Sequence, residues 1–287
     1  MLKPLRALQF LLAVLLLANA LVATAAAPPS VESGFRLLYE MRFEEGRSQI
    51  RSWETEHSAD PLGHAWEAAS YLFEEFYRQG VLTSEFFRDD NELLEGIKGK
   101  PSPEYRAAFL GANTMAQNLA KQRLAVDPND VEALFTLTIT SGMRADYASL
   151  IDQRQIESLK FIRESETYGK KLLAAKSDAA DAYVALGAAN YIIGSLPAHK
   201  RLLLFLGRIR GDRQLGMAQL AMAAARGNYL RPFAKILLAL VAVREGQVEL
   251  ARTQFKELAL EFPRSPLFAR ELAMLERTPS SHPVVPR

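Results

Sequence analysis

The sequence predicts an all-α protein, a right-handed α-solenoid of helix pairs with two helical insertions. Helical spacing and capping residues recur through residues 28–277, and no stretch sustains the apolar–polar alternation typical of strands. Ala239 and Ala251 are small residues placed where two helices can cross closely, and Pro263 ends the second helix. With 49% hydrophobic residues, a chain of 287 residues can bury a large core.

Two stretches resemble the tetratricopeptide repeat (TPR), a helix–turn–helix unit of about 34 residues. The second half of its consensus is matched by Ala251, Phe255 and Pro263. The first half is matched by Tyr183, Leu186 and Gly187, with tyrosine in place of tryptophan. The resemblance implies a stack of degenerate helix pairs whose concave face binds a partner.

The phase of this repeat places unit starts at Pro61, Val131, Ala180 and Pro232. A weaker unit precedes them and is marked by Gly46, Ile50 and Trp53. Pro61 and Val131 are 70 residues apart, which predicts two units between them. The next two intervals are 49 and 52 residues, so each carries an insertion of about 15 to 18 residues beyond one unit. We expect four to five helix pairs.

Capping signals set several helix boundaries in chain order. Ser102-Pro103-Glu104 opens a helix that runs toward Leu124, and Asp130 caps the helix from Val131 to Ser141. Asp212 caps the helix from Arg213 to Arg226, which Gly227 stops. Ser265-Pro266 starts a last helix through Glu276, whose Arg270, Glu271 and Glu276 suit a polar terminal cap. Residues 82–101 read as a loop after a brief helix.

The first 25 residues have the composition of a signal peptide, and the remainder forms one domain over residues 28–277 with a disordered tail at 278–287. Lys3 and Arg6 precede the apolar run Leu8–Leu17, and Ala23-Thr24-Ala25 fits a cleavage site. We therefore expect an exported protein, periplasmic or envelope-associated. The alternative is an uncleaved anchor in the inner membrane. The chain has no cysteine, which excludes disulfides and a lipoprotein anchor.

Charge and motifs favour a non-catalytic protein without a cofactor or a nucleic-acid partner. Removal of Lys3 and Arg6 leaves 33 basic and 33 acidic side chains. The sequence has no cysteine nucleophile, phosphate-binding loop, dinucleotide fingerprint or serine-hydrolase elbow. His57 and His64 flank a turn near Glu54, Glu56 and Glu67, which are suitable metal ligands. Ordinary polar turns collect the same residues, so we predict no metal site.

The second insertion is basic and carries an apolar block, Leu202–Leu206. Its candidate partner-binding cations are Lys200, Arg201, Arg208, Arg210 and Arg213. A solvated helix face is the favoured interpretation, followed by binding of an acidic peptide or terminal carboxylate, and then by docking on a membrane surface. Residues 180–275 resemble a eukaryotic TPR family linked to the mitochondrial outer membrane and inclusion-body clearance. That resemblance implies only scaffolding or binding.

The concave positions of the repeat are apolar, which is unusual for a groove that reads charged peptides. They are Phe135, Ile139, Val184, Tyr191, Phe233, Ile236 and Leu240. An open groove would expose a large apolar patch, so we expect an occupant. The favoured occupant is the chain's own Leu202–Leu206 block, and the alternative is a hydrophobic peptide or lipid-like ligand.

The sequence thus favours a protein-interaction scaffold in the bacterial cell envelope with an unknown protein partner. The alternative is a periplasmic binding protein that holds a hydrophobic ligand in its concave groove. The two differ in one structural expectation. A ligand carrier should enclose a cavity lined by Phe135, Tyr191, Phe233 and Leu240, whereas a scaffold should have an open or self-filled groove and an accessible basic patch.

Overall fold

The computed structural model describes residues 30–89, 96–198, 201 and 210–277, and these residues form helices without strands. The predicted signal peptide and C-terminal tail lie outside them. The helices are α2 (Val31–Tyr39), α3 (Phe43–Glu56), α4 (Pro61–Arg78), α5 (Ser84–Arg88), α7 (Pro103–Val126), α8 (Val131–Asp146), the π-helix η1 (Tyr147–Ile151), α9 (Gln155–Ala175), α10 (Ala182–Ser195), α12 (Arg213–Arg226), α13 (Arg231–Arg244), α14 (Val248–Glu261) and α15 (Pro266–Glu276). Among these helices, none has the length and apolar composition needed to cross a membrane.

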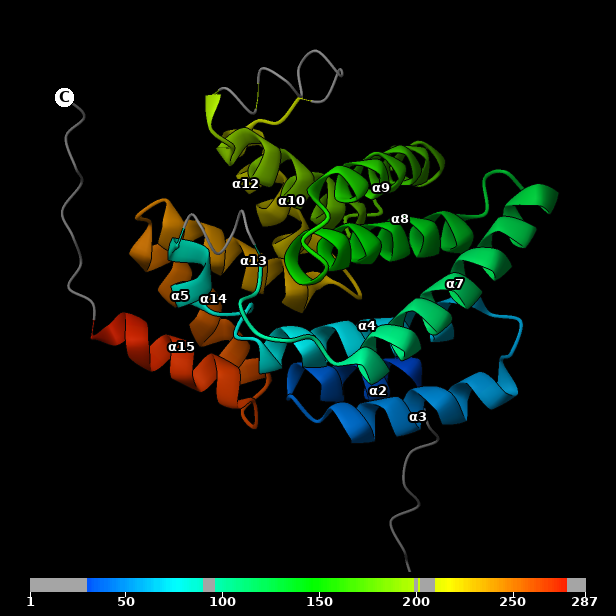
Figure 1. Ribbon diagram of the computed structural model, residues 1–287, viewed down its shortest axis with the longest axis horizontal. Coiled ribbons are helices and arrows are strands. Elements are labelled where there is room, and N and C mark those ends of the chain that lie inside the picture. Colours follow the sequence, from blue (N-terminus) through cyan, green and yellow to red (C-terminus); the bar gives the residue numbers. More distant parts are fainter. Residues whose placement is uncertain (1–29, 90–95, 199–200, 202–209, 278–287) are drawn as a thin grey trace, which may run out of the picture.

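The helices pack as neighbouring pairs, which makes the fold an α-solenoid (Figure 1). The pairs are α2/α3, α4/α7, α8/α9, α10/α12 and α13/α14, and α15 packs on α14. The predicted caps are confirmed: Ser102, Asp130 and Asp212 accept hydrogen bonds from backbone N–H groups at the starts of α7, α8 and α12. The helix after Asp130 is longer than predicted, because α8 continues to Asp146.

Small residues lie at the helix crossings, as the repeat phase requires. A Cβ added to Gly34 would lie 3.1 Å from the Gly46 carbonyl oxygen, which brings α2 against α3. A Cβ on Gly187 would lie 2.9 Å from the Gly216 carbonyl oxygen, where α10 meets α12. Ala251 is fully buried in the α13/α14 pair. The repeat phase therefore holds at both ends of the chain, including the N-terminal unit that the sequence marks only weakly.

The prediction of two repeat units between Pro61 and Val131 is wrong. In the described part of this stretch, residues 61–89 and 96–130, the helices are one pair, α4 and α7, with the short helix α5 between them in sequence. Gly80 turns the chain out of α4 with a φ of +73°, a left-handed conformation that favours glycine. α5 then packs against α13, far along the chain, instead of completing a second pair. A stretch with the length of two repeats can thus contain one repeat and an inserted segment that packs elsewhere in the fold.

The first and last pairs of the solenoid meet, so the superhelix closes on itself. Arg36 Nη1 lies 3.7 Å from Glu261 Oε1, and Arg264 Nη2 lies 2.9 Å from Glu40 Oε2. Tyr39 packs against Phe262 with ring centroids 5.2 Å apart. The main hydrophobic core accordingly includes residues from Val31 to Leu275.

Glu271 completes this closure, and the prediction that it gives α15 a polar outer face is wrong. Its side chain is fully buried. Glu271 Oε2 accepts hydrogen bonds from the Ser84 backbone N–H at 2.9 Å and from Ser84 Oγ at 2.6 Å. A buried carboxylate requires such donors, and here they come from α5. Glu271 therefore connects α5, in the N-terminal half of the solenoid, to the last helix, α15, by two hydrogen bonds.

Candidate functional site: an apolar cavity with one carboxyl group

The concave face of the solenoid is largely filled by α4. Trp66 lies 6.0 Å from Phe135 and 5.7 Å from Tyr229, measured between ring centroids. Phe73 lies 5.1 Å from Phe233. These contacts join helices that are distant in sequence, so α4 supplies an apolar occupant of the predicted groove. The Leu202–Leu206 block, which the sequence favours as the occupant, lies outside the described residues.

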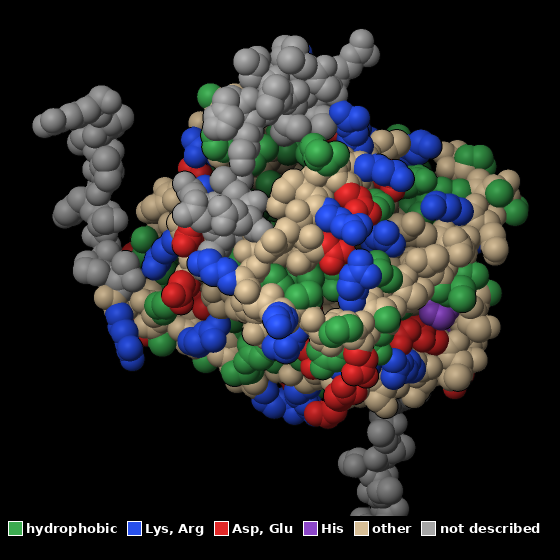
Figure 2. All heavy atoms as spheres, viewed as in Figure 1, with side chains coloured by type: hydrophobic (Ala, Val, Ile, Leu, Met, Phe, Trp, Pro, Cys, Tyr) green, Lys and Arg blue, Asp and Glu red, His purple; other side chains and the backbone are tan. Residues whose placement is uncertain are grey.

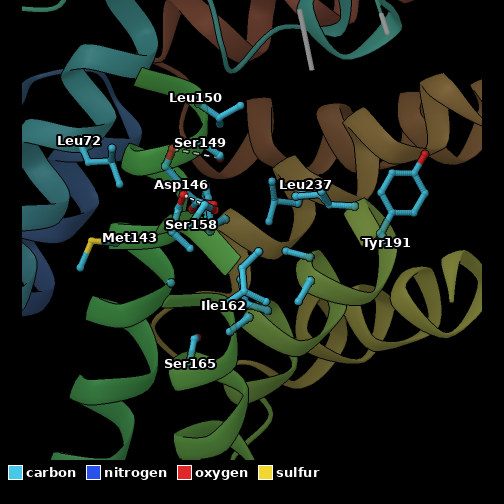
Figure 3. Close-up of a pocket in the computed structure, with 18 of the residues that line it drawn as sticks. Leu72, Met143, Asp146, Ser149, Leu150, Ser158, Ile162, Ser165, Tyr191 and Leu237 are labelled. Atoms are coloured by element: carbon cyan, nitrogen blue, oxygen red, sulfur yellow. Dashed lines mark hydrogen bonds between the residues drawn. The ribbon is translucent and has the colours of Figure 1, made fainter. Parts of the chain in front are cut away.

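The filling is incomplete and leaves a cavity of about 390 Å³ between α4, α8, α9, α10 and α13. Protein interiors are otherwise packed as densely as organic crystals, and natural ligand pockets begin at about 300 Å³. Apolar side chains dominate the lining, among them Phe73, Ile162, Leu220 and Leu237. The close-up in Figure 3 shows α8 and α9 on one side of this space and Leu237 and Tyr191 on the other.

The seven predicted groove residues divide into two sets. Four of them line the cavity: Ile139, Val184, Tyr191 and Phe233. The other three, Phe135, Ile236 and Leu240, are buried in the surrounding packing and do not line it. Of the four residues expected to line the closed cavity of a ligand carrier, Tyr191 and Phe233 line this partly open pocket, and Phe135 and Leu240 do not.

Asp146 is the one Asp, Glu, Lys, Arg or His residue in the cavity lining described by the structure. It is the last residue of α8 and precedes the π-helix η1. Its carboxylate has no hydrogen-bond or ion-pair partner among the described residues, and Figure 3 places it at the end of the cavity near Ser149 and Ser158. Burial raises the pKa of Asp146 to about 7, and no charged neighbour contributes to that rise.

The hydroxyl groups beside Asp146 are already engaged with backbone oxygens. Ser158 Oγ donates to the Ala145 carbonyl at 2.9 Å, and Ser165 Oγ donates to the Thr138 carbonyl at 2.7 Å. Both bonds connect α9 to α8. The Ser149 hydroxyl contacts the Asp146 carbonyl oxygen at 3.4 Å rather than its carboxylate. These hydroxyls hold the cavity wall together and leave the carboxylate unsatisfied.

The far wall of the cavity contains Tyr191, whose hydroxyl points away from Asp146 (Figure 3). This hydroxyl donates a hydrogen bond to Glu245 Oε1 at 2.8 Å. Arg213 Nη1 lies 3.3 Å from the same oxygen. The ring of Tyr191 thus faces the cavity while its polar end joins a surface ion pair, so the far wall presents only apolar surface to a ligand.

The predicted basic patch is described only in part. Lys200 and Arg208 lie outside the described residues. Arg213 pairs with Glu245, and Arg201 Nη1 donates to the Gly194 carbonyl at 3.4 Å. Arg210 also has an interaction partner. Figure 2 shows basic and acidic side chains interspersed over the face in view, without one extended basic area.

The histidine-rich turn brings three of the candidate metal ligands together. The ligand atoms of Glu54, His64 and Glu67 lie within 4.8 Å of one another. His64 Nδ1 is 3.2 Å from Glu54 Oε1, and Arg51 Nε is 2.7 Å from Glu67 Oε1. The hydrogen bond with Glu54 raises the pKa of His64. His57 lies outside this group and stacks on Trp53. Arg51 and, when protonated, His64 offset the negative charge of the two carboxylates.

Asp146 is a site residue that the sequence interpretation missed. Asp146 belongs to no motif. A signal was nevertheless present, because the apolar stretch from residue 133 to 151 contains only two charged residues, Arg144 and Asp146. Arg144 reaches out over the Phe161 ring at 4.8 Å, which leaves Asp146 as the inward charge. A lone acid in a long apolar segment is therefore a usable sign of a polar point in a cavity.

No family model matches the chain, and no curated protein matches it. Among solved structures, the fold is similar to the crystal structure of a thermophilic TPR protein from Thermus thermophilus, with 14% sequence identity and a TM-score of 0.45. The alignment covers 86% of this chain and 99% of that chain.

Proposed function

We propose that this protein is a non-catalytic helical-repeat binding protein that holds a small apolar ligand inside its closed solenoid. The observation that carries the proposal is the apolar cavity of about 390 Å³. Natural ligand pockets begin at about 300 Å³ and are lined mainly by apolar side chains, so this space has the size and the lining of a small-molecule site.

A small apolar ligand fits this architecture better than a peptide bound along the concave face of the solenoid. Solenoids use their concave surfaces for binding, but α4 covers much of this one. What remains is a space bordered by side chains from α4, α5, α8, η1, α9, α10, α12 and α13. We place the protein in the bacterial envelope, as a periplasmic binding protein, because its first 25 residues have the composition of an export signal.

Native mass spectrometry of protein purified gently from its own host tests for a resident ligand. A small-molecule adduct that dissociates on activation supports the proposal. Isothermal titration of ligand-free protein with 1-decanol tests the cavity directly. Ala188 lines the cavity, so Ala188→Phe should abolish decanol binding by filling the space. Ala221 is exposed on α12, and Ala221→Phe is the matched control that should bind as the wild type does. Equal binding by both variants would place the ligand elsewhere.

The second candidate function is the protein-interaction scaffold that the sequence favours. One observation supports it: Leu215 and Met222 lie one heptad apart on α12 and are 48% and 39% exposed. Leu215 follows Arg213, the last cation of the basic insertion, by two residues along the chain, so a protein partner that binds this apolar strip would lie near Arg213. If the scaffold is the function, Leu215→Glu with Met222→Glu abolishes co-purification of a stoichiometric partner and leaves decanol binding intact. Membrane docking instead predicts co-sedimentation with anionic vesicles at low salt.

A further inference from the structure

We propose that the cavity selects ligands with one protonated amine at the end of an apolar body, and that the Asp146 carboxylate binds this amine. This inference rests on the proposed function, because it requires that a small molecule enters the cavity. It adds the chemical class of the ligand and the residue that recognises it.

The Asp146 carboxylate can accept hydrogen bonds that the described residues do not donate. An ionised carboxylate can accept about four hydrogen bonds, and Asp146 receives none from the described residues. The Ser158 hydroxyl, which comes from the facing helix α9, donates to the Ala145 carbonyl oxygen instead. An acceptor that faces a largely apolar cavity has no protein donor to satisfy it, so a ligand that supplies donors there gains more than one that does not.

The negative charge of Asp146 also favours a positively charged ligand. No Lys, Arg or His lines the cavity in the described part of the chain, so the protein offers no counter-charge to Asp146. An anionic amphiphile would place a second negative charge beside the first. A neutral alcohol would donate one hydrogen bond and leave the charge uncompensated. A primary ammonium group donates three hydrogen bonds and neutralises the charge, which makes it the best match.

Polar residues are unevenly distributed over the cavity lining. The polar lining residues Asp146, Gln155 and Ser158 come from α8 and α9, whereas Leu220, Phe233, Leu237 and Val241 form an apolar wall from α12 and α13. A ligand with one polar end satisfies both parts, and a ligand with two polar ends would bury one against hydrocarbon. Taking about 30 Å³ per non-hydrogen atom, the 390 Å³ space accommodates about a dozen atoms, the size of decylamine.

Isothermal titration with decylamine, 1-decanol and decanoate at about pH 8.5 tests the inference, since the Asp146 carboxylate is then ionised and an alkylamine is protonated. Decylamine should bind about tenfold to a hundredfold more tightly than 1-decanol, the range that a charge-assisted hydrogen bond provides, and decanoate should bind most weakly. Asp146→Asn keeps the shape of the site and should reduce decylamine affinity to that of 1-decanol.

Glu157→Gln is the control, because Glu157 is an exposed acid paired with Arg154 and does not line the cavity. It should retain the full preference for decylamine. Equal affinities of the wild type for decylamine and 1-decanol, or a preference that survives Asp146→Asn, would overturn the inference and leave ligand binding in place. Failure of all three compounds to bind the wild type would overturn the proposed function together with the inference.

Discussion

The α13/α14 pair and the α8–η1–α9 pair derive from the same repeat pattern and pack in opposite ways. In α13/α14, Ala239, Ala251 and Phe255 are fully buried and the crossing is tight. In α8/α9, a Cβ added to Gly142 would meet only Ser165 Oγ, at an ordinary contact distance of 3.5 Å. Both pairs border the cavity, but α13 contributes apolar side chains, whereas α8 and α9 contribute Asp146 and Ser158. Departure from the repeat thus coincides with the polar part of the candidate site.

The irregular backbone between α8 and α9 has a local cause. The π-helix η1 accommodates part of the first insertion. Two residues after η1 ends, Gln153 adopts a left-handed conformation with a φ of +56°. The linker before α7 fixes this segment, because the Ile97 N–H donates to the Leu150 carbonyl at 2.8 Å. Single π-turns inside helices occur frequently at functional sites. Here the π-turn directly follows Asp146 and fixes where the carboxylate enters the cavity.

The largest effect is expected at the tight crossing. Ala251→Trp should destabilise the protein by about 3 kcal/mol or more, because a fully buried crossing has no room for an indole ring. Urea unfolding followed by circular dichroism measures the change in the free energy of unfolding. Ala221→Trp, on the exposed face of α12, should change it by less than about 0.5 kcal/mol. Similar stabilities for the two variants would contradict the repeat phase.

The next effect concerns the closure of the solenoid. Glu271→Ala should destabilise the protein by about 2–3 kcal/mol, because it leaves the buried Ser84 N–H and hydroxyl groups without an acceptor. Hydrogen exchange should show the loss first in α5 and α15, the two helices that the bond joins. Exchange that rises evenly over all helices would show that Glu271 does not act as a local fastener.

The third effect is a pH-dependent stability change at Asp146. Its pKa is about 7 in the folded protein and about 4 in the unfolded chain, so the folded state keeps a proton that the unfolded state releases. Wild-type stability should therefore fall as pH rises from about 4 to about 7 and then level off. Three pKa units correspond to roughly 4 kcal/mol, and an unpaired amide offsets part of that gain.

Asp146→Asn removes this titration, so its free energy of unfolding relative to the wild type should be roughly 4 kcal/mol higher above pH 7 than below about pH 4. Thermal unfolding of ligand-free protein across this pH range measures the difference. A constant difference at every pH would mean that the carboxyl group titrates normally and is not buried.

The smallest effects compare two glycines. Gly142→Ala should stabilise the protein by up to about 1 kcal/mol, since alanine favours helix and its methyl group would meet only Ser165 Oγ at an ordinary contact distance of 3.5 Å. Gly187→Ala should instead destabilise by about 1 kcal/mol or more, since its Cβ would lie 2.9 Å from the Gly216 carbonyl oxygen. Melting temperatures of the two variants should move in opposite directions. A shift in the same direction would show that the two pairs do not differ in packing.

Much of the secondary structure was predictable because its signals are local. Ser102, Asp130 and Asp212 cap the helices that follow them within three residues. Four of the seven predicted groove residues line the cavity for the same reason, since repeat phase decides which helix face turns inward. The role of Glu271 was misread, because its acidic character on a terminal helix favours solvent unless another segment supplies donors.

The sequence by itself determined the all-α class, the helix ends and the small residues at the crossings, since each depends on residues within about one repeat. Tertiary structure alone decided that α4 fills the concave face, that the ends meet through Arg36 and Glu261, and that Asp146 enters a cavity. The reason is geometric. Each helix pair adds a small rotation, and the sum over five pairs, with their insertions, sets whether the superhelix stays open or closes.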